Sequence, residues 1–119
     1  MDRKFPKSER LHSRKSIKEL FDKSSSFFLY PFKVVFFVRE SVGTDQVLIS
    51  VSKRKLRKAT DRNWVKRRIR EAYRHHKHLM KGNPDRHKHI GIIYVSSDLI
   101  PYDIVQKKIE TILRKLSKL

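Results

Sequence analysis

The residues from Lys53 to Lys77 read KRKLRKATDRNWVKRRIREAYRHHK, and this stretch decides how the chain folds and what its surface can bind. It contains twelve lysines and arginines but only two acids, Asp61 and Glu71, so it holds a net +10 of the chain's formal +18. Each lysine or arginine that meets a phosphate releases condensed counterions. Charge concentrated in this way favours nucleic acid as the partner.

The same stretch has the spacing of an amphipathic helix. Thr60 or Asp61 could cap its first turn, and Gly82-Asn83-Pro84 would end it after about Leu79. Its apolar side needs another layer to pack against. That side comprises Val65, Ile69, Ala72 and His76, flanked by Tyr73 and Leu79.

The opposite side of the predicted helix is a row of basic and amide side chains, which we call the basic ridge: Asn63, Lys66, Arg67, Arg70, Arg74 and Lys77. Solvated helix faces usually interleave acids with bases at four-residue spacing. Like charges stacked along nearly four turns oppose folding unless a partner neutralises them. We therefore expect the ridge to be free of compensating acids and to lie against nucleic acid.

Elements upstream of this helix follow from capping and periodicity. Residues 1–11 predict a basic N-terminal arm that ends on Leu11, and residues 13–23 predict a helix with Ser13 as its N-cap. Serines 24–26 end that helix. Residues 32–39 and 46–52 have the β-branched and aromatic composition of strands, and the short link between them predicts antiparallel pairing.

Downstream, the nearly continuous apolar run of residues 89–95 predicts a central strand, and a helix follows Pro101. The apolar face of that last helix comprises Val105, Ile109, Ile112, Leu113 and Leu116. Residues 1–119 are thus expected to form one α+β domain. It would have a small, mostly antiparallel sheet of about four strands with three helices packed on it, in the order α-β-β(-β)-α-β-α.

Composition excludes some kinds of site and some locations in the cell. The absence of cysteine excludes disulfides and thiolate metal sites. The longest apolar run, Val34 to Val38, is too short to span a bilayer, and no hydrophobic N-terminal block indicates a secretory signal. We expect a cytoplasmic protein with no membrane partner.

Three segments together resemble the signature of the bacterial ribonuclease P protein subunit. They are Val51-Ser52-Lys53-Arg54, then Asp61-Arg62-Asn63-Trp64-Val65-Lys66-Arg67, and Arg70-Glu71-Ala72-Tyr73-Arg74. That family carries Arg-Asn-Arg, one apolar residue, Lys-Arg and a further arginine on a basic helix, after a Ser-Lys-Lys-type strand end. The flanking helices and strands also follow the family's order. The resemblance implies a fold like domain 2 of ribosomal protein S5 (ribosomal-protein-S5-domain-2-like).

The resemblance also implies a function. In this family a large RNA is the catalyst and the small basic protein is its non-catalytic cofactor. The ribonuclease P holoenzyme, an endonuclease, hydrolyses precursor tRNA to remove the 5′ leader. The expected partners are ribonuclease P RNA and precursor tRNA, with no DNA. Mg²⁺ would be bound mainly by the RNA, and none stably by the protein.

Two sets of residues are assigned on this basis, with no catalytic or metal-binding residue among them. The expected RNA-binding residues are Lys53, Arg54, Arg57, Lys58, Arg62, Asn63, Trp64, Lys66, Arg67, Arg70, Arg74 and Lys77. A cleft between the first helix and the sheet would accept the single-stranded leader, lined by Ile17, Phe21, Val35, Phe37 and Lys53. Simple core packing is the alternative for Phe21 and Phe37.

Two features depart from the family pattern. Trp64 occupies the position of the usual second arginine, where it either packs on the core or stacks on a base. The loop from Arg54 to Thr60 lacks a glycine common in the family and is one residue longer.

Other functions fit the sequence less well. A structural, ribosomal-type RNA-binding protein would share the charge and the style of fold. A DNA-binding recognition helix carries fewer basic residues per turn. A stand-alone nuclease needs clustered carboxylates or a histidine pair, whereas the twelve acids are scattered. A zinc site built from the histidines at 75, 76, 78, 87 and 89 would lack the cysteine or acidic ligands that usually accompany histidine.

Overall fold

The computed structural model describes residues 5–80 and 85–119. A single 3-10 turn, η1 (Lys7–Glu9), precedes the first helix, α1 (Arg14–Lys23), and strands β1 (Ser25–Leu29), β2 (Phe32–Arg39) and β3 (Gln46–Val51) follow. The basic helix α2 (Ala59–His76) runs into a second 3-10 turn, η2 (Lys77–Leu79). Strand β4 (His87–Tyr94) and helix α3 (Tyr102–Ser117) complete the chain. The predicted α+β class and element order are confirmed.

The four strands form one mixed sheet in the order β1-β2-β4-β3. Strand β2 pairs antiparallel with β1 and β4, whereas β3 pairs parallel with β4, so that Val47 faces Ile90 and Ile49 faces Ile92. The predicted direct pairing of residues 32–39 with residues 46–52 is therefore wrong. The most apolar strand, β4, lies between them in the central position that its composition predicted.

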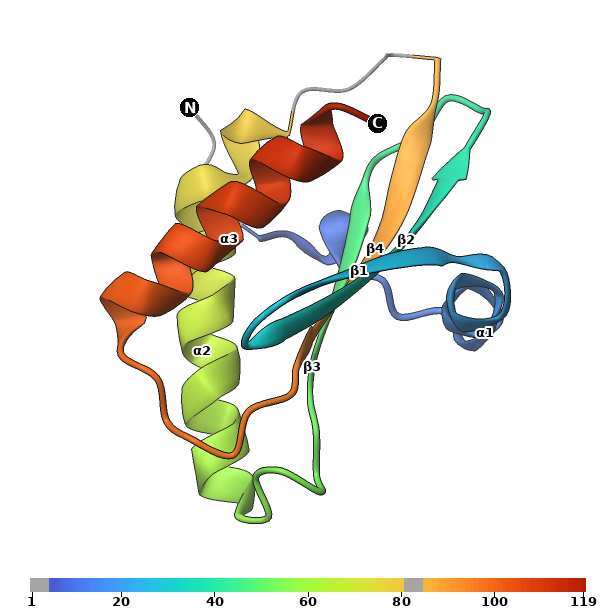
Figure 1. The fold of residues 1–119 in the computed structure, drawn as a ribbon. Coiled ribbons are helices and arrows are strands. Elements are labelled where there is room, and N and C mark those ends of the chain that lie inside the picture. The colour runs from blue at the N-terminus through green and yellow to red at the C-terminus, as the bar shows by residue number, and fades with distance from the viewer. Residues whose placement is uncertain (1–4, 81–84) are drawn as a thin grey trace.

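The parallel pair explains where α2 lies. Parallel neighbours need a crossover connection, and the chain leaves β3, forms α2 and returns as β4. Helices α2 and α3 cover one face of the sheet, and α1 lies on the other (Figure 1). The main core lies between the sheet and the α2–α3 pair and contains the whole predicted apolar face of α3. A smaller cluster of Leu11, Leu20 and Val35 holds α1 on the opposite face.

Some predicted boundaries need correction. Ser13 caps α1 as expected and accepts a hydrogen bond from the Ser16 amide at 3.4 Å. Helix α2, however, begins at Ala59 with Lys58 at its N-cap, and no side chain caps it. Asp61 lies instead in the first turn, where its charge is favourable to the helix dipole. The expected stop at Gly82-Asn83-Pro84 lies outside the described residues.

Strand β1 was not predicted from the sequence. Its serines looked like a helix stop, and only Phe27, Phe28 and Leu29 hint at a strand. Ser25 lies opposite Phe36 and Leu29 opposite Phe32, so β1 and β2 form a hairpin whose turn contains a cis Tyr30–Pro31 bond. Among the described residues, no helix has the length and hydrophobicity needed to cross a membrane.

Candidate nucleic-acid interface

Helix α2 presents the two faces that its periodicity predicted. Val65, Ile69, Ala72 and Tyr73 are buried in the main core. On the other side Asn63, Arg67 and Arg70 are exposed and Lys66 is half-buried. None of Lys66, Arg67 and Arg70 forms an ion pair with an acid in the described part of the chain. This half of the basic ridge is therefore a cationic surface that the fold leaves open.

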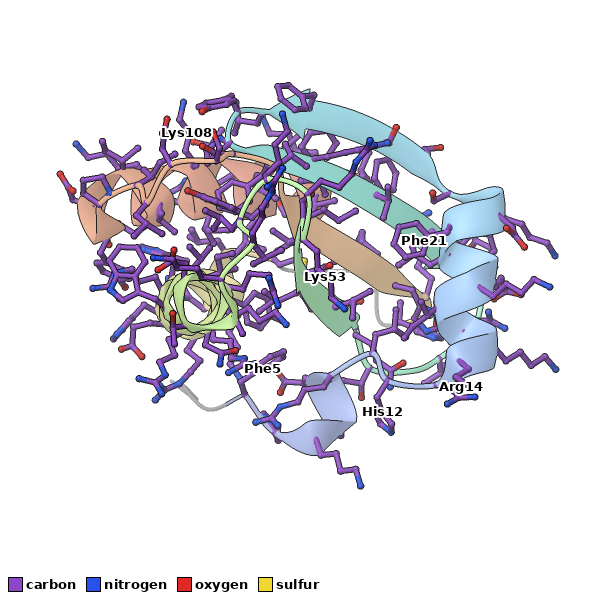
Figure 2. All side chains as sticks on the ribbon, turned by 90° about the horizontal axis from the view of Figure 1, so that it is seen from below. Phe5, His12, Arg14, Phe21, Lys53 and Lys108 are labelled. Atoms are coloured by element: carbon purple, nitrogen blue, oxygen red, sulfur yellow. The ribbon has the colours of Figure 1, made fainter. Side chains whose placement is uncertain are left out.

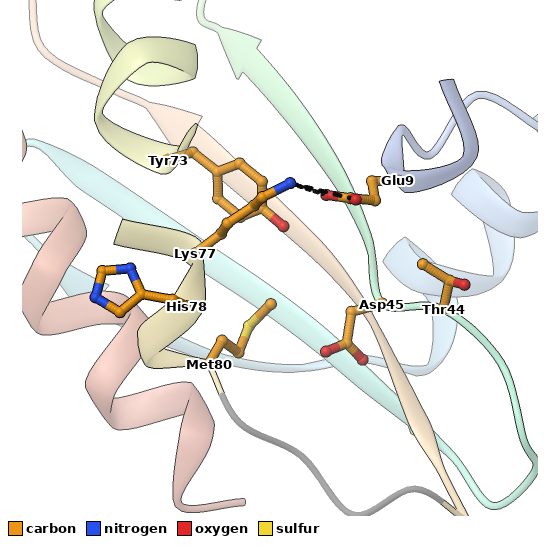
Figure 3. Close-up of a pocket in the computed structure, with 7 residues that line it drawn as sticks. All are labelled: Glu9, Thr44, Asp45, Tyr73, Lys77, His78 and Met80. Carbon is orange, nitrogen blue, oxygen red and sulfur yellow. Dashed lines mark hydrogen bonds and ion pairs between the residues drawn. The ribbon is translucent and has the colours of Figure 1, made fainter. Parts of the chain in front are cut away.

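The other half of the ridge is compensated, contrary to expectation. Lys77 Nζ lies 3.1 Å from Glu9 Oε1, and the Lys77 side chain is only 12% exposed (Figure 3). Arg74 Nη1 lies 2.9 Å from Glu71 Oε2, within the same helix. The prediction of a ridge free of acids is wrong at this end. The helical wheel placed Glu71 off the ridge and could not show that η1 would bring Glu9 beside Lys77.

The loop that leads from β3 into α2 adds further positive charge. Lys53, Arg54, Arg57 and Lys58 are all exposed, and the buried Leu56 anchors the loop on the core. Arg62 closes this loop from the first turns of α2, because its Nη1 donates to the carbonyls of Leu56 at 2.8 Å and Arg57 at 2.7 Å. Arg62 thus orients the loop, and its predicted RNA contact stays a prediction.

Trp64 packs partly against the main core rather than standing free. The guanidinium of Arg68 lies 3.4 Å from the centre of its ring. One part of the ring therefore meets the core and another meets a cation, an arrangement favoured by the ring's quadrupole. Of the two alternatives, this geometry favours packing, because a base would have to displace Arg68 to reach that stack.

The expected leader cleft is divided between buried and accessible residues. Val35 is buried beneath α1, and Ile17 and Phe37 are half-buried around it. Phe21 is 49% exposed, so core packing does not explain it. Seen from below, Lys53 lies just beyond the end of β3 that faces the viewer, while Phe21 lies on α1 (Figure 2). Phe21 and Lys53 are thus the members of this set that could meet a ligand without rearrangement.

The N-terminal arm contributes residues that sequence analysis did not select. Phe5 is 8% exposed, and its ring meets Tyr73 of α2 edge-on at 5.2 Å between centroids. Arg10 Nε donates to the Phe5 carbonyl at 3.1 Å. Leu11 is buried, as expected of the arm's end. The arm therefore lies along α2, and the only sequence signal for this was an aromatic residue in an otherwise polar segment.

Two histidines contact each other, since the rings of His87 and His89 meet edge-on at 5.4 Å between centroids, and the others have different neighbours. His75 contacts Glu71 at 2.7 Å, His76 lies 3.5 Å from Gln106, and His89 is buried in β4. Burial lowers the pKa of His89, as do the nearby charges of Arg39 and His87. Within residues 5–80 and 85–119, no cluster of three or more histidines and acids has the geometry to hold a metal ion.

Comparisons with known proteins agree with this architecture. The family model described as Ribonuclease P matches residues 5–117. The chain is similar to two proteins named Ribonuclease P protein component from two strains of Porphyromonas gingivalis. One is 34% and the other 33% identical over an alignment of 116 residues, and each match covers 93% of this chain and 85% of the relative.

Solved structures extend the similarity to three dimensions. The Staphylococcus aureus RNase P protein superimposes with a TM-score of 0.75 at 26% identity, covering 92% of this chain and 95% of that one. The RNase P protein of Thermotoga maritima has the same fold, with a TM-score of 0.71 at 24% identity, covering 90% of this chain and 96% of that one.

Proposed function

The chain belongs to the ribonuclease P protein family, and on that premise we propose that it is the protein cofactor of ribonuclease P. In this role it binds the catalytic RNA and the 5′ leader of precursor tRNA, and it promotes endonucleolytic removal of the leader. The observation that carries the proposal is the open cationic face of α2, formed by Lys66, Arg67 and Arg70. The proposed setting is the cytoplasm.

The electrostatics of this face support an RNA partner. Several cations without acid partners on one helix repel one another, and phosphates relieve that repulsion while releasing their own counterions. The exposed loop cations Lys53, Arg54, Arg57 and Lys58 continue the same surface toward the end of β3. The backbone of a folded RNA offers enough closely spaced phosphates to neutralise both segments at once.

The leader would bind separately, near α1. A single strand needs an aromatic platform beside positive charge. Phe21 offers an exposed ring on α1, and the exposed Lys53 follows the end of β3 (Figure 2). Holding the catalytic RNA on α2 and the leader near α1 would raise the affinity for precursor tRNA over that for mature tRNA, which has no leader.

The described residues do not suit a resident Mg²⁺, because no cluster of three or more histidines and acids among them could hold a metal ion. That ion prefers carboxylate and other oxygen ligands with most of its waters retained. The glutamates at 9, 19, 40, 71 and 110 each pair with a basic side chain. We therefore assign Mg²⁺ to the partner RNA. The protein's cations would share in neutralising that RNA and so lower the Mg²⁺ concentration it needs.

Reconstitution tests the function directly. The protein, a bacterial ribonuclease P RNA and a precursor tRNA are combined at low Mg²⁺, and release of the leader is followed with time. We expect faster leader removal with the protein than with RNA alone, and no cleavage by the protein alone. Cleavage without the RNA would overturn the cofactor role. RNA binding with no effect on cleavage would instead support a structural RNA-binding protein.

A further inference from the structure

A cavity of about 380 Å³ lies between η1, the start of β3 and the end of α2 (Figure 3). Its walls include Glu9, Asp45, Tyr73, Lys77 and Met80. Two carboxylates against one ammonium group give these walls a formal charge of −1, with histidine neutral, in a chain whose formal charge is +18. The cavity adjoins the basic ridge but has the opposite charge, so it suits a ligand that brings hydrogen-bond donors rather than a phosphate.

One oxygen of Asp45 is fixed and the other is open. Its Oδ1 accepts a hydrogen bond from the main-chain amide of Lys88 at 2.7 Å. Its Oδ2 has no hydrogen bond or ion pair with the described part of the chain. Glu9 differs, because both of its carboxylate oxygens bind Lys77. Asp45 is therefore the carboxylate of this cavity that an incoming N–H donor can reach, and the Lys88 amide holds it in position.

The hydroxyl group of Tyr73 opens into the same cavity. Tyr73 is only 2% exposed, yet its hydroxyl forms no hydrogen bond with any described residue and points toward the side on which Glu9 and Asp45 lie (Figure 3). A buried polar group without a partner lowers the stability of the fold, so this one predicts a ligand. Burial, followed by the charges of Glu9 and Asp45, raises the pKa of Tyr73, so the hydroxyl stays a donor at physiological pH.

Guanine is the base whose edge matches these groups. Its N1–H and its amino group lie side by side and can donate together to one carboxylate, whereas adenine, cytosine and uracil have no such pair of donors. Its O6, next to N1–H, accepts from a hydroxyl group. Proteins read unpaired RNA bases on this edge. Met80 supplies an apolar wall for the ring, and the volume lies within the range of about 300–1,000 Å³ that takes small ligands.

From this geometry we propose that Asp45 and Tyr73 form a pocket for an unpaired guanine of an RNA bound on the basic ridge. Asp45 accepts from N1–H and the amino group, and Tyr73 donates to O6. The pair of Glu9 and Lys77 forms one wall. The pocket deepens the proposed function and rests on it for the source of the base. It adds a contact that reads a base to a surface whose other contacts would be to phosphates.

Binding of short RNAs to the intact protein tests the pocket. Three pentanucleotides of uridine carry guanine, hypoxanthine or adenine at the centre, and fluorescence anisotropy at one salt concentration compares their affinities. Guanine should bind about tenfold or more tighter than adenine, as expected for a bidentate contact to a base. Hypoxanthine lacks only the amino group of guanine and should bind about threefold or more weaker than guanine. The phosphates are the same in all three, so the differences report the base alone.

Two substitutions assign the preference to the pocket. Asp45→Asn should abolish it, because the amide can still accept from Lys88 but no longer offers two acceptors to guanine. Tyr73→Phe removes only the hydroxyl and should reduce the preference about threefold or more. Asp103→Asn is the matched control, because it removes the same charge from an exposed position in the first turn of α3, and the preference should change less than about twofold. Circular dichroism confirms the helix content of each variant.

Nuclear magnetic resonance locates the base. Guanosine 5′-monophosphate should shift the amide resonances of Thr44, Asp45 and Met80 more than adenosine 5′-monophosphate does, although both carry the same phosphate. Equal shifts would overturn the pocket. Guanosine 5′-monophosphate that binds as tightly as the guanine pentanucleotide would assign the pocket to a free nucleotide and overturn its assignment to RNA.

The outcomes separate the pocket from the proposed function, because these measurements need no ribonuclease P RNA. Equal affinity for the three pentanucleotides, or a preference that survives unchanged in Asp45→Asn or Tyr73→Phe, overturns the pocket even where reconstituted leader removal succeeds. A preference for guanine that both substitutions reduce and Asp103→Asn keeps establishes the pocket, even where reconstitution fails and the cofactor role falls.

Discussion

The ammonium group of Lys77 is bound by both carboxylate oxygens of Glu9, at 3.1 and 3.3 Å, across 68 residues of sequence. This contact fastens the N-terminal arm to the end of α2, and it supplies an internal acid to a residue that the sequence assigned to RNA. Glu9 therefore competes with phosphate for Lys77. With Glu9 in this position, we expect RNA binding to be weaker than it would be without the acid. We expect the docked arm to be more stable.

Glu9→Gln should separate these two effects. We expect a loss of about 1 kcal/mol in the free energy of unfolding, since one charge-assisted contact becomes a neutral one. Affinity for ribonuclease P RNA should rise at the same time. Urea denaturation and RNA binding at fixed salt measure the two quantities. Glu110→Gln is the control, because its pair with Arg114 is exposed on α3 and should contribute less than about 0.5 kcal/mol. Equal effects of the two changes would contradict the role of Glu9.

Arg67→Ala and Arg70→Ala should weaken RNA binding in a salt-dependent way. Both side chains are exposed on α2, and each lost phosphate contact lowers the slope of log K against log salt by about 0.9 for a duplex and about 0.7 for a single strand. Binding to ribonuclease P RNA at several salt concentrations measures this slope. Lys118→Ala removes an exposed cation beyond the end of α3 and should leave it unchanged. If both arginine substitutions also left the slope unchanged, this face of α2 would not contact RNA.

Helices were predictable from the sequence because their signal is local. The buried faces of α2 and α3 follow from spacing alone, as Val65, Ile69, Val105 and Ile109 illustrate. Strand order is not local. The short link from β2 to β3 suggested a hairpin, yet β4, whose nearly continuous apolar run suits a strand buried on both faces, lies between them.

The candidate site was predictable to a similar extent. Exposure of Arg67 and Arg70 follows from the helical wheel. The engagement of Lys77 by Glu9 and the approach of Arg10 to α2 depend on where the arm lies, which its polar sequence does not encode by periodicity. The resemblance to a family supplied what periodicity could not, namely the identity of the polyanion.

Gly91→Ala should destabilise the docking of α1 on the sheet. A Cβ atom at this position in β4 would lie 2.7 Å from Val35 Cγ2 and 3.4 Å from Leu20 Cδ2, both in the small cluster beneath α1. Valine is short and buried here and cannot swing away, so we expect a loss of about 1–3 kcal/mol in the free energy of unfolding. At the exposed Gly43 the three nearest atoms to an added Cβ belong to the half-buried His87 ring, at 2.6 to 3.0 Å, and this ring can rotate away whereas Val35 cannot, so Gly43→Ala should cost less. Urea denaturation of both variants measures the difference, and a larger loss for Gly43→Ala would contradict this account.

Stability should fall in mild acid because of His89. Burial, followed by the charges of Arg39 and His87, lowers the pKa of His89 below 6.5 in the folded protein, although Glu19 and Asp45 act in the opposite direction. Below pH 6.5 the unfolded chain binds a proton that the folded chain does not, so the free energy of unfolding decreases as pH falls from 6.5 to the folded pKa.

Urea denaturation between about pH 5 and pH 7.5 measures this dependence. His89→Gln should flatten it, while His12→Gln, at an exposed position before α1, should not. An unchanged slope in His89→Gln would assign the dependence to another group.

Phe21→Ala should impair recognition of the leader without harming the fold. The ring is 49% exposed on α1, so its removal leaves little cavity, and the change in stability should be below about 1 kcal/mol. A base stacked on the ring contributes about 1–3 kcal/mol, so the reconstituted holoenzyme should lose roughly five-fold or more in affinity for precursor tRNA. Affinity for mature tRNA, which lacks the leader, should not change. Ile104→Ala is the matched control, because this side chain is 43% exposed on α3, and both affinities should stay as they are. Equal losses for precursor and mature tRNA in Phe21→Ala would place Phe21 outside the leader site, since a stacking platform for the leader cannot affect a tRNA that has none.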